Sequence, residues 1–382
     1  MIIDNVKVYT PEQKFVKGGM ILENDRISDI YTDENKPDLT GKEVLDGKGA
    51  YAIPGLIDLH FHGCMGDDFC DNSLEALERI AEYEASVGVT AIAPATMTLP
   101  AEELLDVLKT AARYKREKHD YKNLVGINME GPFISPVKKG AQDERNILPC
   151  DVNLCERFLE ASEGLVKFIG IAPEESRNSL DFIRQMKEKV SISLAHTNAD
   201  YDTAMGAFNA GADHAVHLYN AMPEILHRAP GVVGAVFDSK HVMAEIICDG
   251  IHIHPATVRA TFQMMGADRM ILISDSMRAT GMPDGQYTLG GLDVKVVGKL
   301  ATLVSDGAIA GSATNLADCM RTAVQKMNLP LETAIACATI NPARSLKIDD
   351  EYGSLEKGKK ANVVLLEPDL TLKCVIKDGK QI

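Results

Sequence analysis

Two histidines, His60 and His62, stand one residue apart in the segment "IDLHFHGC" (57–64), directly after an apolar run. On a strand, residues i and i+2 point to the same face, so this spacing can present two imidazoles to one metal ion. Gly63 then lets the backbone turn away beneath the pair. An isolated His-x-His is also common as a surface or hydrogen-bonded pair, so these two residues alone leave both interpretations open.

Four later apolar segments also end in residues that can bind a metal or move a proton. Glu130 lies in "LVGINMEGPF", His196 ends "VSISLAH", His217 ends "ADHAVH" and Asp275 lies in "MILISDSM". A helix cap or a salt bridge would explain each acid alone, and packing would explain each histidine. Five strand ends that carry His, Glu, His, His and Asp together favour a metal site. His214, on the opposite strand face from His217, is expected to support or pack.

The pattern of apolar and polar residues predicts the strands and helices that must position these residues. Past Pro54, apolar runs alternate with helical patterns, as in "SLEALERIAEYEASVG" followed by "VTAIAPATMT". This alternation is typical of βα units around a parallel sheet, and a parallel barrel has its active site at the carboxyl ends of its strands. We therefore expect an α/β fold with a (β/α)8 TIM-like barrel over residues 53–345.

The two ends of the chain have a pattern that differs from the rest of the sequence. Both consist of short runs of strand-forming residues separated by Gly, Asn, Asp and Pro, as in "MIIDNVKVYT" and "NVVLLEPDLTLKCVIKDGKQI". Such runs are typical of short strands joined by turns. Because the two ends look alike, we expect them to pair in one small β-sandwich domain, built from residues 1–52 and 346–382.

Composition limits the classes of function. The 382 residues are 45% hydrophobic and 25% charged, and no run approaches the roughly 18 apolar residues of a membrane span. A net charge of −15 disfavours nucleic acid as a partner but leaves room for an anionic small substrate in a local basic pocket. Eight cysteines without any Cys-x-x-Cys, and a start without a basic region before an apolar segment, lead us to expect a cytoplasmic protein with reduced thiols and no membrane partner.

Longer motifs in the sequence resemble those of a known family. In order along the chain they are "PGLIDLHFHG", "MEGPFISPVKKGAQ", "LAHTNA", "HLYNAMPEILHRAPG", "CDGIHIHP", "ILISDSMRATGMPDGQY" and "IAGSATNLADCM". The chain resembles the amidohydrolase superfamily and, more narrowly, its N-acetylglucosamine-6-phosphate deacetylases. The resemblance implies metal-dependent hydrolysis of N-acetyl-D-glucosamine 6-phosphate to D-glucosamine 6-phosphate and acetate, a step of amino-sugar catabolism.

The resemblance also implies roles for single residues. Asp275 would be the general acid and base, activating a metal-held water for attack on the acetyl carbonyl and then passing the proton to the departing amine. One or two divalent ions are implied, with zinc expected and iron, manganese or cobalt as alternatives. The implied ligands are His60, His62, Glu130, His196, His217 and Asp275.

For the substrate, the family pattern implies that Arg228 and His252 meet the phosphate, with one of them reaching the site of a neighbouring subunit in a homodimer. The full implied set of substrate contacts is Ala141, Gln142, Asn220, Ala221, Arg228, Asp249, His252, Ile309, Ala310 and Gly311. Some relatives have a histidine where this chain has Gln142, which can donate a hydrogen bond but cannot titrate. We expect a second ion, held by His60 and His62, to take over polarisation of the carbonyl.

Three alternatives stay open at this point. The substrate could be N-acetylgalactosamine 6-phosphate, which differs at one hydroxyl, or the protein could be another amidohydrolase that does not need Arg228 and His252 together. A third reading is a non-catalytic amidohydrolase-like binding protein. Retention of the whole set of implied ligands argues against that third reading, because a non-catalytic descendant has little reason to keep it.

Overall fold

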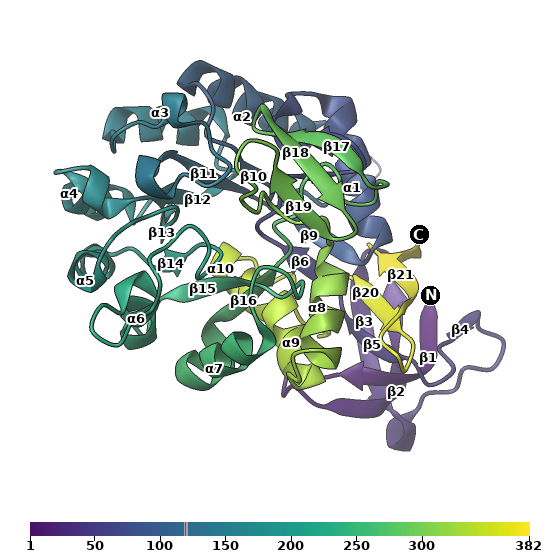
Figure 1. Ribbon diagram of the computed structural model, residues 1–382. Coiled ribbons are helices and arrows are strands. Elements are labelled where there is room, and N and C mark those ends of the chain that lie inside the picture. Colours follow the sequence, from purple (N-terminus) through teal and green to yellow (C-terminus); the bar gives the residue numbers. More distant parts are fainter. Residues whose placement is uncertain (118, 120) are drawn as a thin grey trace.

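A parallel barrel forms the centre of the molecule in the computed structural model, which describes residues 1–117, 119 and 121–382 (Figure 1). Its strands, in chain order, are β6 (Leu56–Asp58), β9 (Val89–Ile92) with β10 (Ala95–Thr96), β11 (Ile127–Phe133), β12 (Val166–Ile171), β13 (Ser191–Leu194), β14 (His214–Ala215), β15 (Met243–Ile247) and β16 (Met270–Ile273). Neighbours pair in parallel from β10 to β16, and β6 pairs in parallel with β9. Pro94 interrupts the second strand between β9 and β10.

The barrel closes between its last strand and its first. The backbone N–H of Asp275 donates to the carbonyl of His60 at 3.0 Å, and that of His62 donates to the carbonyl of Ser276 at 2.7 Å. These bonds hold the ends of β6 and β16 side by side at the barrel mouth. Two of the predicted metal ligands and the predicted proton carrier therefore come from adjoining strand ends.

Helices cover the outside of the barrel, one after each strand (Figure 1). They are α1 (Leu74–Ser86), α2 (Ala101–Arg116), α3 (Val152–Ala161), α4 (Ser179–Met186), α5 (Tyr201–Ala210), α6 (Gly231–Asp238), α7 (Pro255–Met265) and α8 (Leu316–Gln325), followed by α9 (Leu331–Ala338) and α10 (Ile340–Leu346). Local sequence explains their starts: Ser73 and Asp200 accept backbone N–H bonds as N-caps of α1 and α5. Apolar residues at helical spacing, such as Leu104 and Leu108, turn one face inward. The predicted TIM-like barrel is confirmed.

Strand periodicity sorts the side chains between two cores. On β16, Ile271 and Ile273 join a small buried cluster with β6 and β15, whereas Met270 and Leu272 join the large cluster beneath the helices. Asp275 continues the parity of Ile271 and Ile273, past the carboxyl end of the strand. Asp275 lies beyond the strand and has a φ of 49°, so this bend, as well as the alternation, determines where its side chain points.

The two chain ends form one sheet in the order β22–β21–β20–β5–β1–β2–β3, with β4 beside β1. Its strands are β1 (Ile2–Tyr9), β2 (Phe15–Glu23), β3 (Arg26–Thr32), β4 (Val44–Asp46), β5 (Tyr51–Pro54), β20 (Val363–Leu366), β21 (Leu372–Lys377) and β22 (Lys380–Gln381). Ile3 and Met20 share a buried core with Val363 and Leu365, and both termini lie in this part of the molecule (Figure 1). The predicted small β domain from both ends is confirmed; the exact boundaries 1–52, 53–345 and 346–382 stay a prediction.

An insertion that the sequence analysis did not predict lies between β16 and α8. It is a three-stranded antiparallel sheet of β17 (Gly285–Leu289), β18 (Leu292–Val297) and β19 (Leu300–Leu303). Its apolar face packs on residues of the barrel mouth, including Met97, Ala141 and Met277. The insertion therefore covers part of the face where the strand ends meet.

The remaining short elements connect these parts. They are the β7 (Gly63–Cys64) and β8 (Asp67–Asp68) hairpin and single 3-10 turns at Asp33–Asn35, Phe69–Asp71, Pro136–Lys138, Glu144–Asn146, Pro173–Glu175 and Ala267–Arg269. Among the described residues, no helix has the length and apolar character that crossing a membrane requires.

Candidate active site and metal centre

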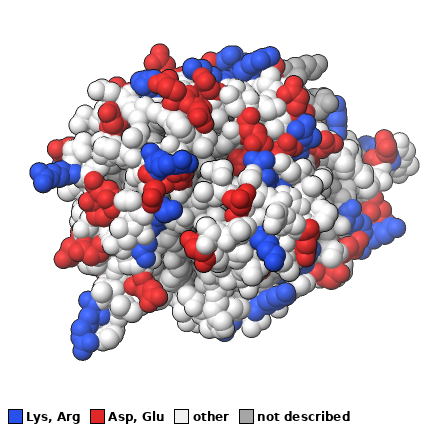
Figure 2. Space-filling model, turned by 45° about the horizontal axis from the view of Figure 1, so that its top comes forward, with Lys and Arg blue, Asp and Glu red and all other residues white. Residues whose placement is uncertain are grey.

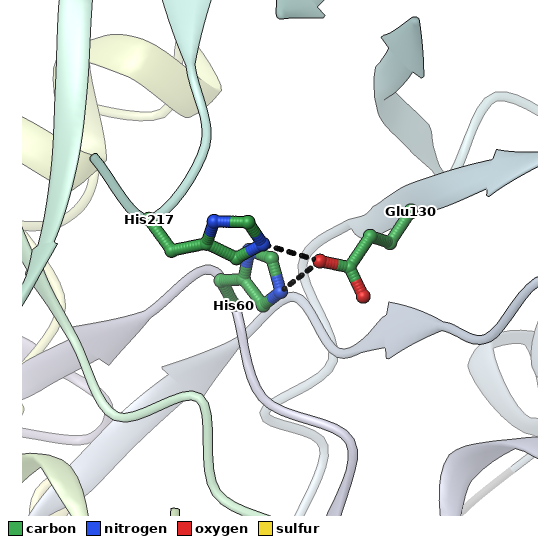
Figure 3. Close-up of side chains that lie close together, drawn as sticks. All are labelled: His60, Glu130 and His217. Carbon is green, nitrogen blue, oxygen red and sulfur yellow. Dashed lines mark hydrogen bonds and ion pairs between the residues drawn. The ribbon is translucent and has the colours of Figure 1, made fainter. Parts of the chain in front are cut away.

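Glu130, on β11, lies at the centre of a cluster of histidines. Its Oε1 is 2.7 Å from Nε2 of His217 and 2.9 Å from Nε2 of His196. Nε2 of His60 lies 3.5 Å from the same oxygen (Figure 3). All four side chains are buried. Three histidines from three different strand ends therefore converge on one carboxylate.

His62 and Asp275 complete the cluster on its other side. Nε2 of His62 is 3.3 Å from Oε2 of Glu130 and 3.3 Å from Oδ1 of Asp275. Nε2 of His60 is 3.7 Å from the same Asp275 oxygen. His60 thus faces both carboxylates, and all six residues of the predicted ligand set lie together.

The donor set fits a divalent metal. Ligand atoms of His60, Glu130 and His217, and of His60, His62 and Asp275, form two groups whose members lie within 4.8 Å of one another. Nε2 of His60 and Oδ1 of Asp275 are buried and have no hydrogen-bond partner among the described residues. The two Nε2 atoms of His196 and His217 are 3.2 Å apart. Metal bonds of 2.0–2.1 Å in a tetrahedron give ligand separations of about 3.3 Å, which is close to this spacing.

The backbone bends sharply where three of these residues leave their strands. His196, His217 and Asp275 have positive φ values of 43°, 28° and 49°, in the left-handed region that side chains other than glycine seldom adopt. Such a conformation costs of order 1–3 kcal/mol per residue and is concentrated at functional sites. The bends turn the three side chains toward the barrel mouth, which strand periodicity alone could not predict.

Burial and neighbouring charge act in opposite directions on the ionisable groups. Burial by itself raises the pKa of the Glu130 carboxyl, but His196 and His60 hold that pKa well below its ordinary value. Burial lowers the pKa of His62, yet its bonds to Asp275 and Glu130 raise the pKa to about 10. The pKa values of His60 and His196 are also raised by Glu130 and other acceptors, so protons on His60, His62 and His196 compensate the carboxylates when no metal is present. A bound cation would replace these protons, so metal binding should release them.

Gln142 is held firmly in the same cluster. Its Oε1 accepts the backbone N–H of Thr98 at 2.7 Å, and its Nε2 donates to Oε2 of Glu130 at 2.7 Å. Since the Thr98 N–H can only donate, the amide orientation is fixed, with its nitrogen toward the carboxylate. In this structure, therefore, Gln142 helps to orient Glu130.

Glu245 on β15 supports the cluster from below and was missed by the sequence analysis. His60 donates from Nδ1 to its Oε2 at 2.8 Å, and Nε2 of His214 lies 2.9 Å from its Oε1. Asn128 and the backbone N–H of His217 donate to the same carboxylate at 3.1 Å. His214, which we expected to support or to pack, thus lies against Glu245 and not among the proposed ligands. An acid inside the apolar run "VMAEIICDG" was the available signal, because a buried carboxylate requires partners.

A cavity of about 340 Å³ opens over the cluster. Seven of the ten predicted substrate contacts line it, and these are Ala141, Gln142, Asn220, Ala221, His252, Ile309 and Gly311. The cavity wall also includes Met97, Gly140, Leu289 and Ala308, which the sequence analysis did not select. Leu289 comes from the inserted sheet, so no strand-end pattern could have indicated it.

The other three predicted contacts lie elsewhere. Asp249 lies beneath His252 and accepts a bond from its Nδ1 at 2.7 Å, so it can act on a substrate through that ring. Ala310 is buried between two residues that flank the cavity. Arg228 is exposed, and its guanidinium bonds to the neighbouring His227 instead of lining the cavity of its own chain as the structure describes it.

Comparison with known proteins supports these observations. The model of the amidohydrolase family matches residues 51–382. The N-acetylglucosamine-6-phosphate deacetylase of Bacillus subtilis is 35% identical over 97% of this chain and 93% of that protein, and the N-acetylgalactosamine-6-phosphate deacetylase of Escherichia coli O157:H7 is 34% identical over 86% of each. The solved structure of a mutant N-acetyl-D-glucosamine-6-phosphate deacetylase from Mycobacterium smegmatis, in complex with N-acetyl-D-glucosamine 6-phosphate, has a TM-score of 0.92 and 32% identity, covering 100% of this chain and 98% of the other. This chain therefore belongs to the amidohydrolase family.

Proposed function

We propose that this protein hydrolyses N-acetyl-D-glucosamine 6-phosphate to D-glucosamine 6-phosphate and acetate. Relatives with that activity in their names match nearly the whole chain. The cavity volume is within the roughly 300–1,000 Å³ range of small-molecule sites. The observation that carries the proposal is the carboxylate of Asp275 at the edge of that cavity, with Oδ1 3.3 Å from Nε2 of His62 and without a hydrogen-bond partner among the described residues.

One or two divalent metal ions would be held in the cluster by His60, His62, Glu130, His196, His217 and Asp275. We propose zinc first, with iron, manganese or cobalt as alternatives, because nitrogen and carboxylate ligands suit all four. When bound, such an ion polarises the acetyl carbonyl and lowers the pKa of water toward neutrality.

Asp275 moves the proton. Its carboxylate takes a proton from the attacking water as the new C–O bond forms at the acetyl carbon, and then gives that proton to the amine nitrogen as the C–N bond breaks. Burial would raise the pKa of Asp275, but the bond to His62 and the charge of His60 lower it. The carboxylate is therefore ionised and ready to act as the base at neutral pH.

The sugar phosphate would lie between the cluster and His252. Asn220, Ala221 and the segment from Ile309 to Gly311 would contact the sugar, and Ala141 and Gln142 the region of the acetyl group. Burial lowers the pKa of His252, but the bond to Asp249 raises it above its ordinary value. A protonated His252 offers the phosphate a positive charge and a hydrogen bond.

We propose a homodimer in which Arg228 reaches the cavity of the partner subunit. This residue lies on an exposed segment, together with the exposed apolar residues Ile225 and Leu226. A guanidinium there can grip phosphate oxygens in a bidentate way. The expected mass in solution is twice 41.5 kDa.

The proposed partners are limited to the sugar phosphate and a second copy of the chain. Figure 2 shows basic and acidic side chains intermixed over the face that it draws. Binding to nucleic acid needs clustered Lys and Arg, so we propose that the protein does not bind nucleic acid. We likewise propose that it does not bind a membrane. All eight cysteines are free, in keeping with the proposed cytoplasmic location.

Acetate release tests the proposed function. One metal-analysed preparation is given N-acetylglucosamine 6-phosphate, N-acetylgalactosamine 6-phosphate and unphosphorylated N-acetylglucosamine. We expect the first to have the highest kcat/KM and the third to be much poorer. Faster turnover of the galactosamine compound would support the alternative, which the Escherichia coli relative represents. No acetate from any of them after metal addition would point to a non-catalytic protein.

A further inference from the structure

Glu245 is buried in the barrel, and both of its carboxylate oxygens are fully used. One oxygen meets the ring of His60 and the backbone N–H of His217, and the other meets His214 and Asn128. The carboxylate lines no part of the cavity, so it can meet neither substrate nor water there. Its interactions point instead to a role in holding a neighbouring residue.

We propose that Glu245 is the positioning residue that prepares His60 to bind one particular ion of a two-ion centre. The inference rests on the proposed metal-dependent function and deepens it. A carboxylate can only accept, so the hydrogen of His60 is fixed on Nδ1. Because Nδ1 keeps its hydrogen, Nε2 is the nitrogen that gives up its proton and presents its lone pair when an ion binds. This nitrogen lies between Glu130 and Asp275 and has no hydrogen-bond partner among the described residues. A ring oriented in this way binds metal without first paying the entropy of ordering.

This support is specific to His60. Nδ1 of His196 faces the backbone carbonyl of Lys138 at 2.9 Å, and Nδ1 of His62 and of His217 have no partner in the described part of the chain. Glu245 touches His217 only at its backbone. The ion that depends on His60 should therefore need Glu245, whereas an ion held by Glu130, His196 and His217 should not.

Glu245 is itself prevented from rotating. Nε2 of His214, on the neighbouring strand β14, and Nδ2 of Asn128, on the more distant strand β11, bind its second oxygen. Nδ1 of His214 lies 3.3 Å from the hydroxyl of Ser345 on α10. A continuous chain of contacts thus runs from the base of the barrel to His60. Each member orients the next, which is how supporting residues tune metal ligands.

The test measures metal affinity without substrate. Stepwise dissociation constants for zinc are obtained by competition with a chromophoric chelator for the wild type, Glu245→Gln, His60→Ala and the double variant. Glu245→Gln keeps the shape but loses the charge. We expect it to weaken one ion by about 10–100-fold, the ion lost in His60→Ala, and to leave the other within about 3-fold. In the double variant, Glu245→Gln should add nothing to the effect of His60→Ala, because it acts through that ring.

Glu84→Gln is the matched control, since Glu84 is equally buried and contacts none of the proposed ligands. It should bind both ions as the wild type does. Unchanged affinities in Glu245→Gln, or equal weakening of both ions, would overturn the inference. If that variant does not fold, Glu245→Asp replaces it: its shorter side chain draws back from His60, so weakening of the same ion supports the inference and unchanged affinity overturns it.

The result is separate from that of the proposed function. A wild type that takes up only one ion would overturn this inference while leaving hydrolysis with a single ion intact. A wild type that binds two ions but releases no acetate would refute the proposed function and leave the role of Glu245 standing.

Discussion

At the scale of single residues, the barrel mouth depends on polar atoms that the protein leaves without partners. Nε2 of His60 and Oδ1 of Asp275 are buried and form no hydrogen bond among the described residues; their ion-pair contacts are 3.3–3.7 Å long. A buried polar atom without a hydrogen bond costs roughly 1–3 kcal/mol. A bound ion and substrate would satisfy them. The protein thus carries a local cost that its ligands remove.

Asp275→Asn tests the proton carrier. The amide keeps the size of the side chain but cannot accept the proton from water, so kcat should fall by about 10²–10⁴-fold. Acetate release and metal content are measured on the same preparation. Asp293→Asn, an exposed change on β18, is the control and should leave kcat unchanged. An Asp275→Asn protein with more than about a tenth of the activity would contradict the assigned role.

Glu84→Gln should stabilise the protein increasingly as pH rises. Burial and the nearby Asp58 raise the pKa of the Glu84 carboxyl well above its ordinary value of 4.5. Above pH 4.5 the unfolded chain loses this proton while the folded chain keeps it, so stability of the wild type falls with rising pH until the folded pKa is passed. Glutamine has no proton to lose.

The measurement is the difference in unfolding free energy between Glu84→Gln and wild type from about pH 5 to 8, with metal held saturating. The difference should grow with pH. Glu103→Gln, at an exposed site on α2, is the control and should give a flat difference. A flat result for Glu84→Gln as well would show that its carboxyl is ionised inside the fold.

Which single residues could be predicted depended on where they lie in the apolar runs. The proposed metal ligands could be selected because a polar side chain at the end of an apolar run is costly to bury unless it is paired or bound to an ion. Glu245 lies inside its apolar run and not at the end, and Leu289 comes from a separate sheet. The same rule therefore selected neither residue. Arg228 was selected by resemblance alone, and a single chain does not bring it to the cavity.

At the scale of elements, the inserted sheet β17–β19 completes the cavity wall. Leu289 lines the cavity, and Val294 on β18 is fully buried against the barrel mouth. Val297, on the same strand, is 56% exposed. The sheet therefore has one face on the site and one in solvent.

Val294→Asp should detach this sheet. A buried carboxylate without a partner costs several kcal/mol, which exceeds what a small sheet gains by packing. The barrel keeps its own core, so we expect its melting temperature to change little while KM rises about 10-fold or more and proteases cut between residues 285 and 303. The matched control Val297→Asp should change none of these. Unaltered KM in Val294→Asp would mean that the sheet is not needed to bind substrate.

The barrel itself was predictable, since alternating helical patterns and buried runs specify βα units. The insertion was not foreseen, although its strands alternate polar and apolar residues around the turns at Gly290–Gly291 and Gly298. The left-handed bends at the strand ends were not predicted either, because His and Asp, although enriched at positive φ, adopt negative φ at most of their positions.

At the scale of the whole molecule, metal should stabilise the fold. An ion that binds only the folded protein adds about 2.7 kcal/mol at a concentration 100-fold above its Kd. Chelation should lower the melting temperature, and zinc, iron, manganese or cobalt should restore it to degrees that follow their affinities. Equal melting temperatures for the metal-free protein and for protein shown to hold stoichiometric metal would contradict this expectation.

The sheet shared by the two chain ends has a consequence for biosynthesis. One edge of β5 pairs with β1 soon after both leave the ribosome, but its other edge pairs with β20, about 300 residues later. At a translation rate of roughly 5–20 residues per second, the backbone groups of that edge stay unpaired for about 15–60 s. An open edge is a template for pairing with other chains, so the nascent protein is most prone to aggregate while its barrel is being made. Translation speed through the barrel, as much as sequence, should set the yield of folded enzyme.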